Sequence, residues 1–520
     1  MHQRRVFLLA FAAFFLVSAA WALALPTDGT YDEKHHIIRA YAVAEGRLFP
    51  AGPASDGTGF GSEGFDVPAS LVPRDVNCLR PRGVASCQHP TADRELVRVP
   101  SAAARYSPVY YLPVGLPLLI SPDHAGVVWA RGVSALLSAL LLAAAVVTAV
   151  RLGSRLLVAG VVLVATPMVM NLSGAVNPNG LEIAAGVLLF TTLTAILRGV
   201  VTRRLLVLTG VAAALLLTVR QLGPLLLAVD VAACAVVAGR ERVGALWRHR
   251  DARRVLGAWV LAGALVDGVW AAVSGGPDTG GVPGRAEHTD LVGRVISERL
   301  PFYAHQLVGQ FGYGEATIST VAVAFWYLLW AVVIVPALIW GGGRLRLVIA
   351  GLAGFSLALL VALDLHFAPL SGWFAHSRYI WPSAAGTVLL AALAEGGPAR
   401  WLAARRVRWL TVAVVAATAP VQLYALARVM TRYQSGLDAA LDPFAGRWLP
   451  PGGPALPLVA MAAGLAGLIA VTDSAFRARG VVVAGAPDDG SVTPDNRSVT
   501  ADGQNADSTA KASTTDAANH

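Results

Sequence analysis

The chain has 520 residues, of which 55% are hydrophobic and only 14% charged, and its mean hydropathy is +0.59. A soluble protein of this length needs more charge on its surface, so the composition predicts a polytopic membrane protein. The formal net charge of +9 does not indicate a nucleic-acid partner, because the arginines cluster in short loops between apolar runs, as the positive-inside rule requires.

The first apolar run, residues 6–25, follows two arginines. It ends in Ala22-Leu23-Ala24, which is compatible with a signal-peptidase site, so a cleaved signal peptide is one interpretation. The apolar part of a signal peptide usually has about 7–15 residues, whereas about 20 residues are needed to span a bilayer. The length of the run therefore favours a retained membrane helix.

A polar loop rich in Gly and Pro follows over residues 26–125, and it is too long to be a simple connector. Cys78 and Cys87 both lie in it, and an oxidising outer face favours a disulfide between them; two unpaired thiols are the alternative. Near its end, residues 108–120 form a short apolar segment interrupted by Pro113 and Pro117. This pattern predicts an interfacial or re-entrant helix.

Further apolar runs follow, and with the first they predict about twelve membrane spans. They lie at residues 126–150, 155–173, 180–198, 205–219, 222–238, 255–273, 319–341, 345–364, 379–395, 409–428 and 456–473. When the N-terminus is placed inside, the short arginine-rich connections fall on the cytoplasmic side, and the long outer loops are exempt from the rule. The sequence thus predicts an all-α polytopic domain over residues 1–475 in the inner or plasma membrane, with both termini cytoplasmic.

Two predicted outer loops are large, residues 26–125 and residues 274–318. Beyond residue 475 the composition changes to Ala, Asp, Ser, Thr and Asn, with almost no large apolar side chains from Gly480 onward. Such a segment cannot bury enough apolar surface to fold. Residues 476–520 are therefore expected to form a disordered cytoplasmic tail.

A dense group of ionisable residues at a predicted membrane boundary follows the first helix, between residues 26 and 36. Its adjacent carboxylates, Asp32 and Glu33, are candidate catalytic residues, because a carboxylate there can act as general base toward an acceptor hydroxyl. The same oxygens can hold a divalent metal ion, so a metal on this pair stays open. His35 and His36 are candidate assisting residues. The alternatives are solvated loop charges and packing histidines.

Arginines near the predicted outer ends of helices form the second set of candidates. Arg131 lies within the second helix, Arg220 lies between the fifth and sixth, and Arg378 with Tyr379 opens the tenth. A charge within or against a membrane is costly and tends to mark a site, and the planar guanidinium binds phosphate oxygens bidentately. The alternative for each arginine is that its head group snorkels to the interface.

Carboxylates within or beside spans form the third set, namely Glu182, Asp230, Asp267 and Asp364. Glu182 lies near the outer face, on the same side as Asp32. It is a candidate second carboxylate of the site or a partner for one of the arginines, and a purely structural pair is the alternative. Asp267 lies deep in its helix, which in a transporter would suggest proton coupling.

Several short motifs, taken in order along residues 5–430, resemble the bacterial membrane family called domain of unknown function 2142. Each motif is weak alone, and their order and topological placement carry the resemblance. The motifs are P-x-D-G-x-x-D-E-x-x-H from Pro26 to His36, Arg39-Ala40-Tyr41, Pro108-Val109-Tyr110-Tyr111, the turn from Asn177 to Glu182, and Arg378-Tyr379.

That family is related to the GT-C glycosyltransferases, so the resemblance implies a GT-C-like fold and a polyprenyl-phosphate-linked sugar as donor. It implies an acidic base or metal ligand in the first outer loop, which maps onto Asp32 and Glu33. It also implies a basic residue that holds the donor phosphate, for which Arg378 is the best match. Related families often carry Asp where this chain has Asn179, which puts a third carboxylate role in doubt.

The sequence therefore favours a glycosyltransferase that moves a sugar from a polyprenyl-phosphate donor to an envelope glycan or protein acceptor. No nucleotide-binding fingerprint occurs, which fits a lipid-borne donor and argues against an ATP-driven pump. One alternative is a transporter or flippase of an envelope precursor, with Asp230 and Asp267 as coupling residues. The other is a non-catalytic membrane protein. The candidate substrate-binding residues are Arg378, Tyr379, Arg220, Arg131, Glu182 and His36.

Overall fold

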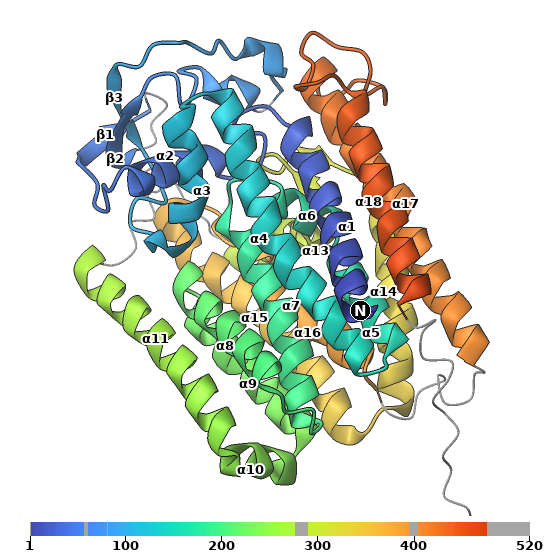
Figure 1. Cartoon of the computed structure of the whole chain (residues 1–520). Helices are drawn as coiled ribbons and strands as arrows, with labels where there is room; N and C mark the ends of the chain where they lie inside the picture. Colours follow the sequence, from blue (N-terminus) through green and yellow to red (C-terminus); the bar gives the residue numbers. More distant parts are fainter. Residues whose placement is uncertain (1, 57–60, 81, 276–289, 395–403, 476–520) are drawn as a thin grey trace, which may run out of the picture. The chain divides into compact units, whose positions relative to one another are not determined.

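A bundle of long helices carries a small mixed α/β cap at one end in the computed structural model of the protein (Figure 1). The structure describes residues 2–56, 61–80, 82–275, 290–394 and 404–475. The bundle helices are α1 His2–Ala24, α4 His124–Arg151, α5 Arg155–Val164, α6 Pro167–Ser173, α7 Pro178–Leu197, α8 Arg203–Val219, α9 Gly223–Ala238, α10 Arg240–Arg248, α11 Arg250–Ser274, α14 Thr320–Trp340, α15 Gly343–Ser371, α16 Trp381–Ala391, α17 Ala404–Ser435 and α18 Ala455–Ser474.

The helical membrane architecture predicted from the sequence is confirmed. In the described part of the chain, eight helices are long and apolar enough to cross a membrane, or ten if each of two bent helix pairs is one span. The bends are 71° between α5 and α6 and 112° between α9 and α10. Two shorter helices, α8 with 17 residues and α16 with 11, lie within two further predicted runs but are shorter than the roughly 20 residues of a full span. They account for the difference from the predicted twelve.

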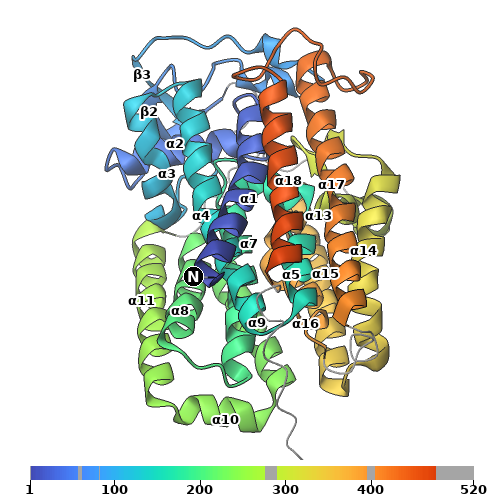
Figure 2. The same cartoon turned by 45° about the vertical axis from the view of Figure 1, so that its right-hand side comes forward.

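The centre of the bundle is α7, every residue of which is buried. A helix that is apolar on all sides needs such a position, because no face of it suits solvent. At the periphery, α1 packs closely against α18 (Figure 2). A Cβ atom at Gly464 would lie 2.8 Å from the carbonyl oxygen of Ala13, so the two backbones approach through small residues.

The first outer loop is a folded unit with its own apolar core. It contains an antiparallel sheet in the order β1-β2-β3, with bounds Gly52–Ser55, Gly61–Pro68 and Leu96–Pro100. Helices α2, Glu33–Ala44, and α3, Pro108–Ile120, pack on each other beside it. Phe65 and Val67 of β2 are buried with Ile37 and Tyr110 of these helices. We call residues 26–120 the cap.

The predicted interfacial segment is the helix α3. Its buried face packs on α2, where a Cβ atom at Gly115 would lie 2.0 Å from the carbonyl oxygen of Ala40. Its other face exposes large apolar side chains, and Ile120 is 84% exposed. A helix that buries one face in protein and exposes apolar residues on the other suits the boundary between cap and lipid.

Cys78 and Cys87 form a disulfide in the cap. They lie in two short helical turns, η1 Val76–Leu79 and η2 Ala85–Cys87. Arg432 of α17 donates hydrogen bonds to the carbonyl oxygens of Leu79 and Gly83, at 2.7 and 2.6 Å. The disulfide-closed loop is thereby attached to the last part of the bundle.

The second outer loop also contains regular structure where it is described. Residues 276–289 lie outside the described part, as does the tail predicted over residues 476–520. The elements that follow are α12 Leu291–Arg294, a π-helical turn η3 Val295–Arg299, α13 Leu300–Val308, and the hairpin of β4 Gln310–Phe311 with β5 Ala316–Thr317.

The two ends of the bundle can be told apart by the chain segments that they carry. His2 Nε2 lies 2.8 Å from the carbonyl oxygen of Ala475, so the start of α1 and the end of α18 share the end opposite the cap. Arg151 and Arg408 are bonded there to Gln3 and Asp473. We call this the inner end and the cap side the outer end. Their assignment to cytoplasm and exterior stays a prediction.

Removing the disulfide by a C78A/C87A double substitution should destabilise the cap by about 2–3 kcal/mol, because a short closed loop regains chain entropy in the unfolded state. The measurement is thermal unfolding of the purified protein in detergent. The control is C234A, since Cys234 is a free buried cysteine in α9. Equal melting temperatures for the double variant and wild type would contradict a stabilising disulfide.

Candidate functional site

The turn that joins α1 to α2 has an unusual backbone. Asp28 and Asp32 have φ angles of 62° and 59°, and they are the non-glycine residues with positive φ in the described part of the chain. Aspartate tolerates the left-handed region better than most residues, but holding it there costs energy, and such positions cluster at functional sites. The surrounding contacts must therefore fix this turn.

Asp28 is the first of these contacts. Its Oδ1 accepts hydrogen bonds from the amide of Lys34 and the hydroxyl of Tyr313, both at 2.9 Å, and its Oδ2 accepts from Arg80 at 3.0 Å. Burial raises the pKa of this carboxyl, although Arg80 and Lys34 act in the opposite direction. With both oxygens used, Asp28 positions the turn rather than facing a substrate.

Glu33 and Arg131 form the second contact, and both side chains are 0% exposed. The guanidinium binds the carboxylate through Nε and Nη2, at 2.7 and 2.6 Å. Arg131 also donates to the carbonyl oxygens of Ala22, Leu25 and Pro26 at the end of α1. Glu33 and Arg131 were both candidate site residues, but their hydrogen-bonding groups are used by contacts inside the protein. We therefore assign these two residues a structural role.

Asp32 has a different environment, because its side chain is 36% exposed. It forms an ion pair with Nη2 of Arg378, whose own side chain is only 2% exposed. The other donors of Arg378, Nε and Nη1, are buried and have no hydrogen-bond partner among the described residues. A buried cation with unused donors beside an accessible carboxylate is an arrangement suited to a bound anion.

The pKa of Asp32 reflects this pairing. Burial acts to raise it, but Arg378 and the neighbouring histidines outweigh burial and hold the pKa below its usual value. Asp32 is therefore ionised at neutral pH.

Tyr379 lies between two guanidinium groups. The Cζ atom of Arg220 is 4.8 Å from its ring centre and that of Arg378 is 5.2 Å away. Arg220 donates to Oδ1 of Asn179 at 2.8 Å, and its Nε is 3.6 Å from Glu182. The outer ends of α7, α8 and α16 thus bring a second cation and a buried carboxylate close to the Asp32–Arg378 pair.

Three histidines, His35, His36 and His376, also lie close to the site. Nδ1 of His36 lies 2.8 Å from the hydroxyl of Tyr111, and the ring of His376 packs on that of Tyr31 with centres 4.9 Å apart. Burial lowers the pKa of both histidines well below the usual value. Burial likewise lowers the pKa of His35 to about 4. These rings are therefore neutral at pH 7.

Several residues of this site were not among the candidates predicted from the sequence. Asp28, Tyr31, Tyr106 and His376 were not singled out, although Tyr31 packs on Arg378 with 4.6 Å from the guanidinium carbon to its ring centre. The signal for Asp28 was present in the sequence, since an Asp before Gly favours a tight turn. Nothing in the sequence marks Tyr31 or Tyr106 beyond their aromatic character.

The remaining candidate carboxylates lie elsewhere. Asp364 binds Arg299 at 2.6 Å and accepts from the backbone amides of Phe374 and Ala375, so it shapes the loop before Arg378. Asp230 is fully buried in α9. Asp267 of α11 lines a small cavity of about 80 Å³ that Arg220 also lines.

A divalent metal held jointly by Asp32 and Glu33 does not fit the geometry, because both oxygens of Glu33 are taken by Arg131. In the described residues, no group of three or more His, Cys, Asp and Glu side chains converges on one point.

An apolar cavity of about 590 Å³ begins beside the site. Its lining includes Ile380 and Trp381, which follow Tyr379 directly, and it continues between α13, α14, α15 and α16. Tyr303, Leu307, Trp330 and Leu360 are also among the residues that line it.

The chain matches the family described as "Predicted membrane protein (DUF2142)" over residues 15–387, more than half of its length. The chain belongs to the DUF2142 family. This confirms the family resemblance inferred from the motifs. The range that matches the DUF2142 family contains Asp32, Arg220 and Arg378 together with Glu33 and Arg131.

No curated protein matches the chain. Among solved structures, it is similar to the crystal structure of ArnT from Cupriavidus metallidurans bound to undecaprenyl phosphate. The two share 15% sequence identity, with a TM-score of 0.37, over 90% of this chain and 77% of that chain. At this level of similarity the ligand of one chain says nothing of the other.

Substituting Arg131 by Met should destabilise the protein by roughly 3–5 kcal/mol, because Glu33 would remain as a buried charge without a partner. The measurement is thermal unfolding in detergent. The double variant E33Q/R131M should recover part of the loss, since it removes both charges together. If R131M unfolds at the wild-type temperature, the pair does not have the structural role assigned to it.

Proposed function

We propose that the protein is a membrane glycosyltransferase that moves a sugar from a polyprenyl-phosphate donor to an acceptor hydroxyl of a cell-envelope glycan or protein. The observation that carries the proposal is the pair of Arg378, buried with two unused donors, and Asp32, accessible and ionised. The outer end of the bundle is the extracytoplasmic face in this proposal, and the membrane is the inner or plasma membrane.

Arg378 binds the phosphate of the donor. Its free Nε and Nη1 meet an anion without breaking the contact of Nη2 with Asp32. Arg220, whose guanidinium also lies against the ring of Tyr379, adds a second positive charge. Guanidinium groups stabilise the charge that develops on a phosphate leaving group without any proton transfer.

The apolar cavity next to Tyr379 receives the lipid chain of the donor. Its volume of about 590 Å³ is lined by residues of α13, α14, α15 and α16. A polyprenyl chain fits there because Trp330 and the leucines of α13 and α15 offer it an apolar surface for van der Waals packing. The phosphate thus lies at Arg378, and the lipid chain extends from it into the cavity that begins at Ile380 and Trp381.

Asp32 acts as general base in a single displacement. The acceptor oxygen attacks the anomeric carbon while the bond from that carbon to the phosphate oxygen breaks. The polyprenyl phosphate leaves with the electron pair, and the proton of the acceptor hydroxyl passes to Asp32. Glu33 holds Arg131 and the end of α1 and takes no part in this step.

Binding of the donor makes Asp32 a better base. In the free protein Arg378 holds the pKa of Asp32 low, which weakens its ability to accept a proton. A bound phosphate neutralises Arg378 and adds a negative charge nearby, and both effects raise the pKa of Asp32. The base is therefore strengthened only when the donor is present.

The direct test is transfer of a labelled sugar from a short-chain polyprenyl-phosphate donor to envelope-type acceptors by the purified protein. D32N should lower kcat by about 10²–10⁴, the usual contribution of a general base. R378Q should lower kcat/KM by roughly 10²–10³, because a leaving-group contact is lost.

The matched controls are D438N and R82Q, which change the same residue types in an exposed ion pair at the outer end. Both should transfer sugar at the wild-type rate. Transfer at the wild-type rate by D32N and R378Q, at equal folded yield, would refute the assignment of these residues.

The acidic limb of the pH–rate profile should differ between kcat/KM and kcat. A base works only when deprotonated, so the rate falls as the pH falls through its pKa. The limb in kcat/KM reports the free protein and should lie below about pH 4, whereas the limb in kcat reports the donor complex and should lie higher. Coincident limbs would contradict the coupling between donor binding and Asp32.

The alternative from the sequence is a transporter or flippase of an envelope precursor. The observation that favours it is Asp230, a carboxylate fully buried in a bundle helix. In proteoliposomes, flux of a labelled precursor that is lost in D230N, with no transfer from any donor, would support this alternative against the transferase.

A further inference from the structure

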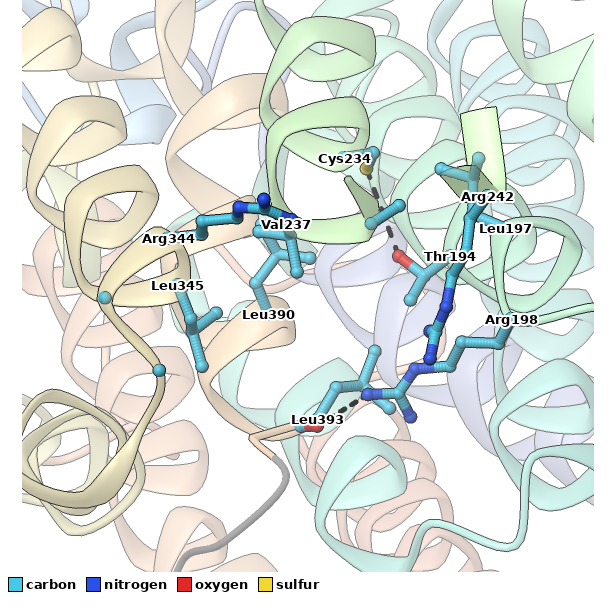
Figure 3. A pocket seen from close by; sticks show the side chains of 13 residues that line it. Thr194, Leu197, Arg198, Cys234, Val237, Arg242, Arg344, Leu345, Leu390 and Leu393 are labelled. Carbon is cyan, nitrogen blue, oxygen red and sulfur yellow. Dashed lines mark hydrogen bonds between the residues drawn. The ribbon is translucent and has the colours of Figure 1, made fainter. Parts of the chain in front are cut away.

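We propose that the inner end of the bundle holds a specific site for the phosphate headgroup of an anionic phospholipid. A cavity of about 440 Å³ opens there, with lining residues from α7, α9, α10, α15 and α16 and from the segments that adjoin them (Figure 3). Its residues lie at the opposite ends of α7 and α16 from Glu182 and Arg378. The site is therefore separate from the proposed transferase site and does not depend on it.

The mouth of this cavity is strongly basic. Three arginines line it, and no acidic residue does. Figure 3 shows Arg344 on one side and Arg198 and Arg242 on the other. Arg242 and Arg344 are exposed and take part in none of the ion pairs between described residues. Their charges thus remain for a ligand, and guanidinium groups suit phosphate oxygens.

The backbone beside the cavity leaves room for Arg344. Gly239, between α9 and α10, has a φ of +83°, and a Cβ atom there would lie 2.3 Å from Nη1 of Arg344. Any other residue at this position would be strained and would displace the guanidinium. The bend of 112° between α9 and α10 occurs at the same glycine. Gly239 therefore lies at the bend and also leaves the space that the guanidinium of Arg344 occupies.

Behind the arginines the cavity wall is apolar. It is formed by leucine and valine side chains, with the contact of Thr194 to Cys234 on one side, at 3.9 Å. The apolar residues are Leu197, Val237, Leu345, Leu390 and Leu393. A charged mouth above an apolar wall matches an amphiphile, in which an anionic headgroup is joined to acyl chains.

The depth of the cavity in the membrane also fits a lipid headgroup. Helix α10 crosses the inner end of the bundle after the bend, and both views show it nearly perpendicular to α9 and α11 (Figures 1 and 2). None of its residues is buried, and Trp247 is 72% exposed. Exposed tryptophan and arginine on one short helix are typical of the membrane–water interface. The arginines of the cavity mouth therefore lie at headgroup level.

The test is a titration of the full-length protein in phospholipid-free detergent with dioctanoyl phosphatidylglycerol, followed by the melting temperature. Two further titrations serve as comparisons. Dioctanoyl phosphatidylcholine tests a zwitterionic headgroup with the same acyl chains, and glycerol 3-phosphate tests a soluble phosphate without acyl chains. The anionic lipid should bind at least about tenfold more tightly than either, because only it offers both a net negative headgroup and acyl chains.

The R242Q/R344Q double variant should weaken binding of the anionic lipid by about tenfold or more. Both arginines are exposed, so the variant should keep the wild-type melting temperature without lipid. The matched control is R248Q/R250Q, which removes two exposed charges from the same end outside the cavity and should bind as wild type. Equal weakening in both variants would show that the loss of any two positive charges at this end has the same effect, and it would overturn the site. Binding of glycerol 3-phosphate as tight as that of the lipid would overturn the lipid assignment.

Discussion

The buried ion pair of Glu33 and Arg131 is the interaction on which the outer end of the molecule depends. It joins the first residue of α2 to α4, and Arg131 also caps the carbonyl groups at the end of α1. Glu33 accepts in addition from the amide of Val176, before α7. Four segments thus converge on one pair, which sets the entry and exit of the turn that carries Asp32. A pair of this kind is retained for geometry, since desolvation offsets much of its Coulomb energy.

Beside this buried ion pair, the site contains a second ion pair, formed by Asp32 and Arg378. Asp32 is partly exposed and Arg378 has unused donors, so the two are bonded to each other and are still able to engage ligands. Their mutual contact helps to hold the pKa of Asp32 below its usual value. The left-handed backbone of Asp32 stores strain at the same point.

The sequence predicted the long helices well, because a membrane span is recognisable from the length of its apolar run. The orientation that arginine content predicts for the two ends of the bundle stays a prediction. The sequence placed Asp32 and Glu33 together as candidates. The structure separates them, since a left-handed residue at Asp32 turns one carboxylate outward while its neighbour points into the core. Backbone handedness at a non-glycine residue has no dependable sequence signal.

Neither could the sequence show that Asp32 meets Arg378, because 346 residues separate them and only the folded bundle brings them together. The fold of the cap was underestimated for a similar reason. Its core is assembled from short segments around Phe65 and Tyr110, none of which is apolar enough by itself to stand out from a polar loop.

The attachment of Arg432 to the disulfide-closed loop bears on how the protein is made. Leu79 and Gly83 are synthesised early, whereas α17 is among the last helices to leave the ribosome. The loop also holds the turn of the site, because Arg80 binds Asp28 and Gln88 binds the carbonyl of Thr27. The candidate site is consequently completed only after nearly the whole bundle has been inserted, and a nascent chain that stops before α17 lacks this support.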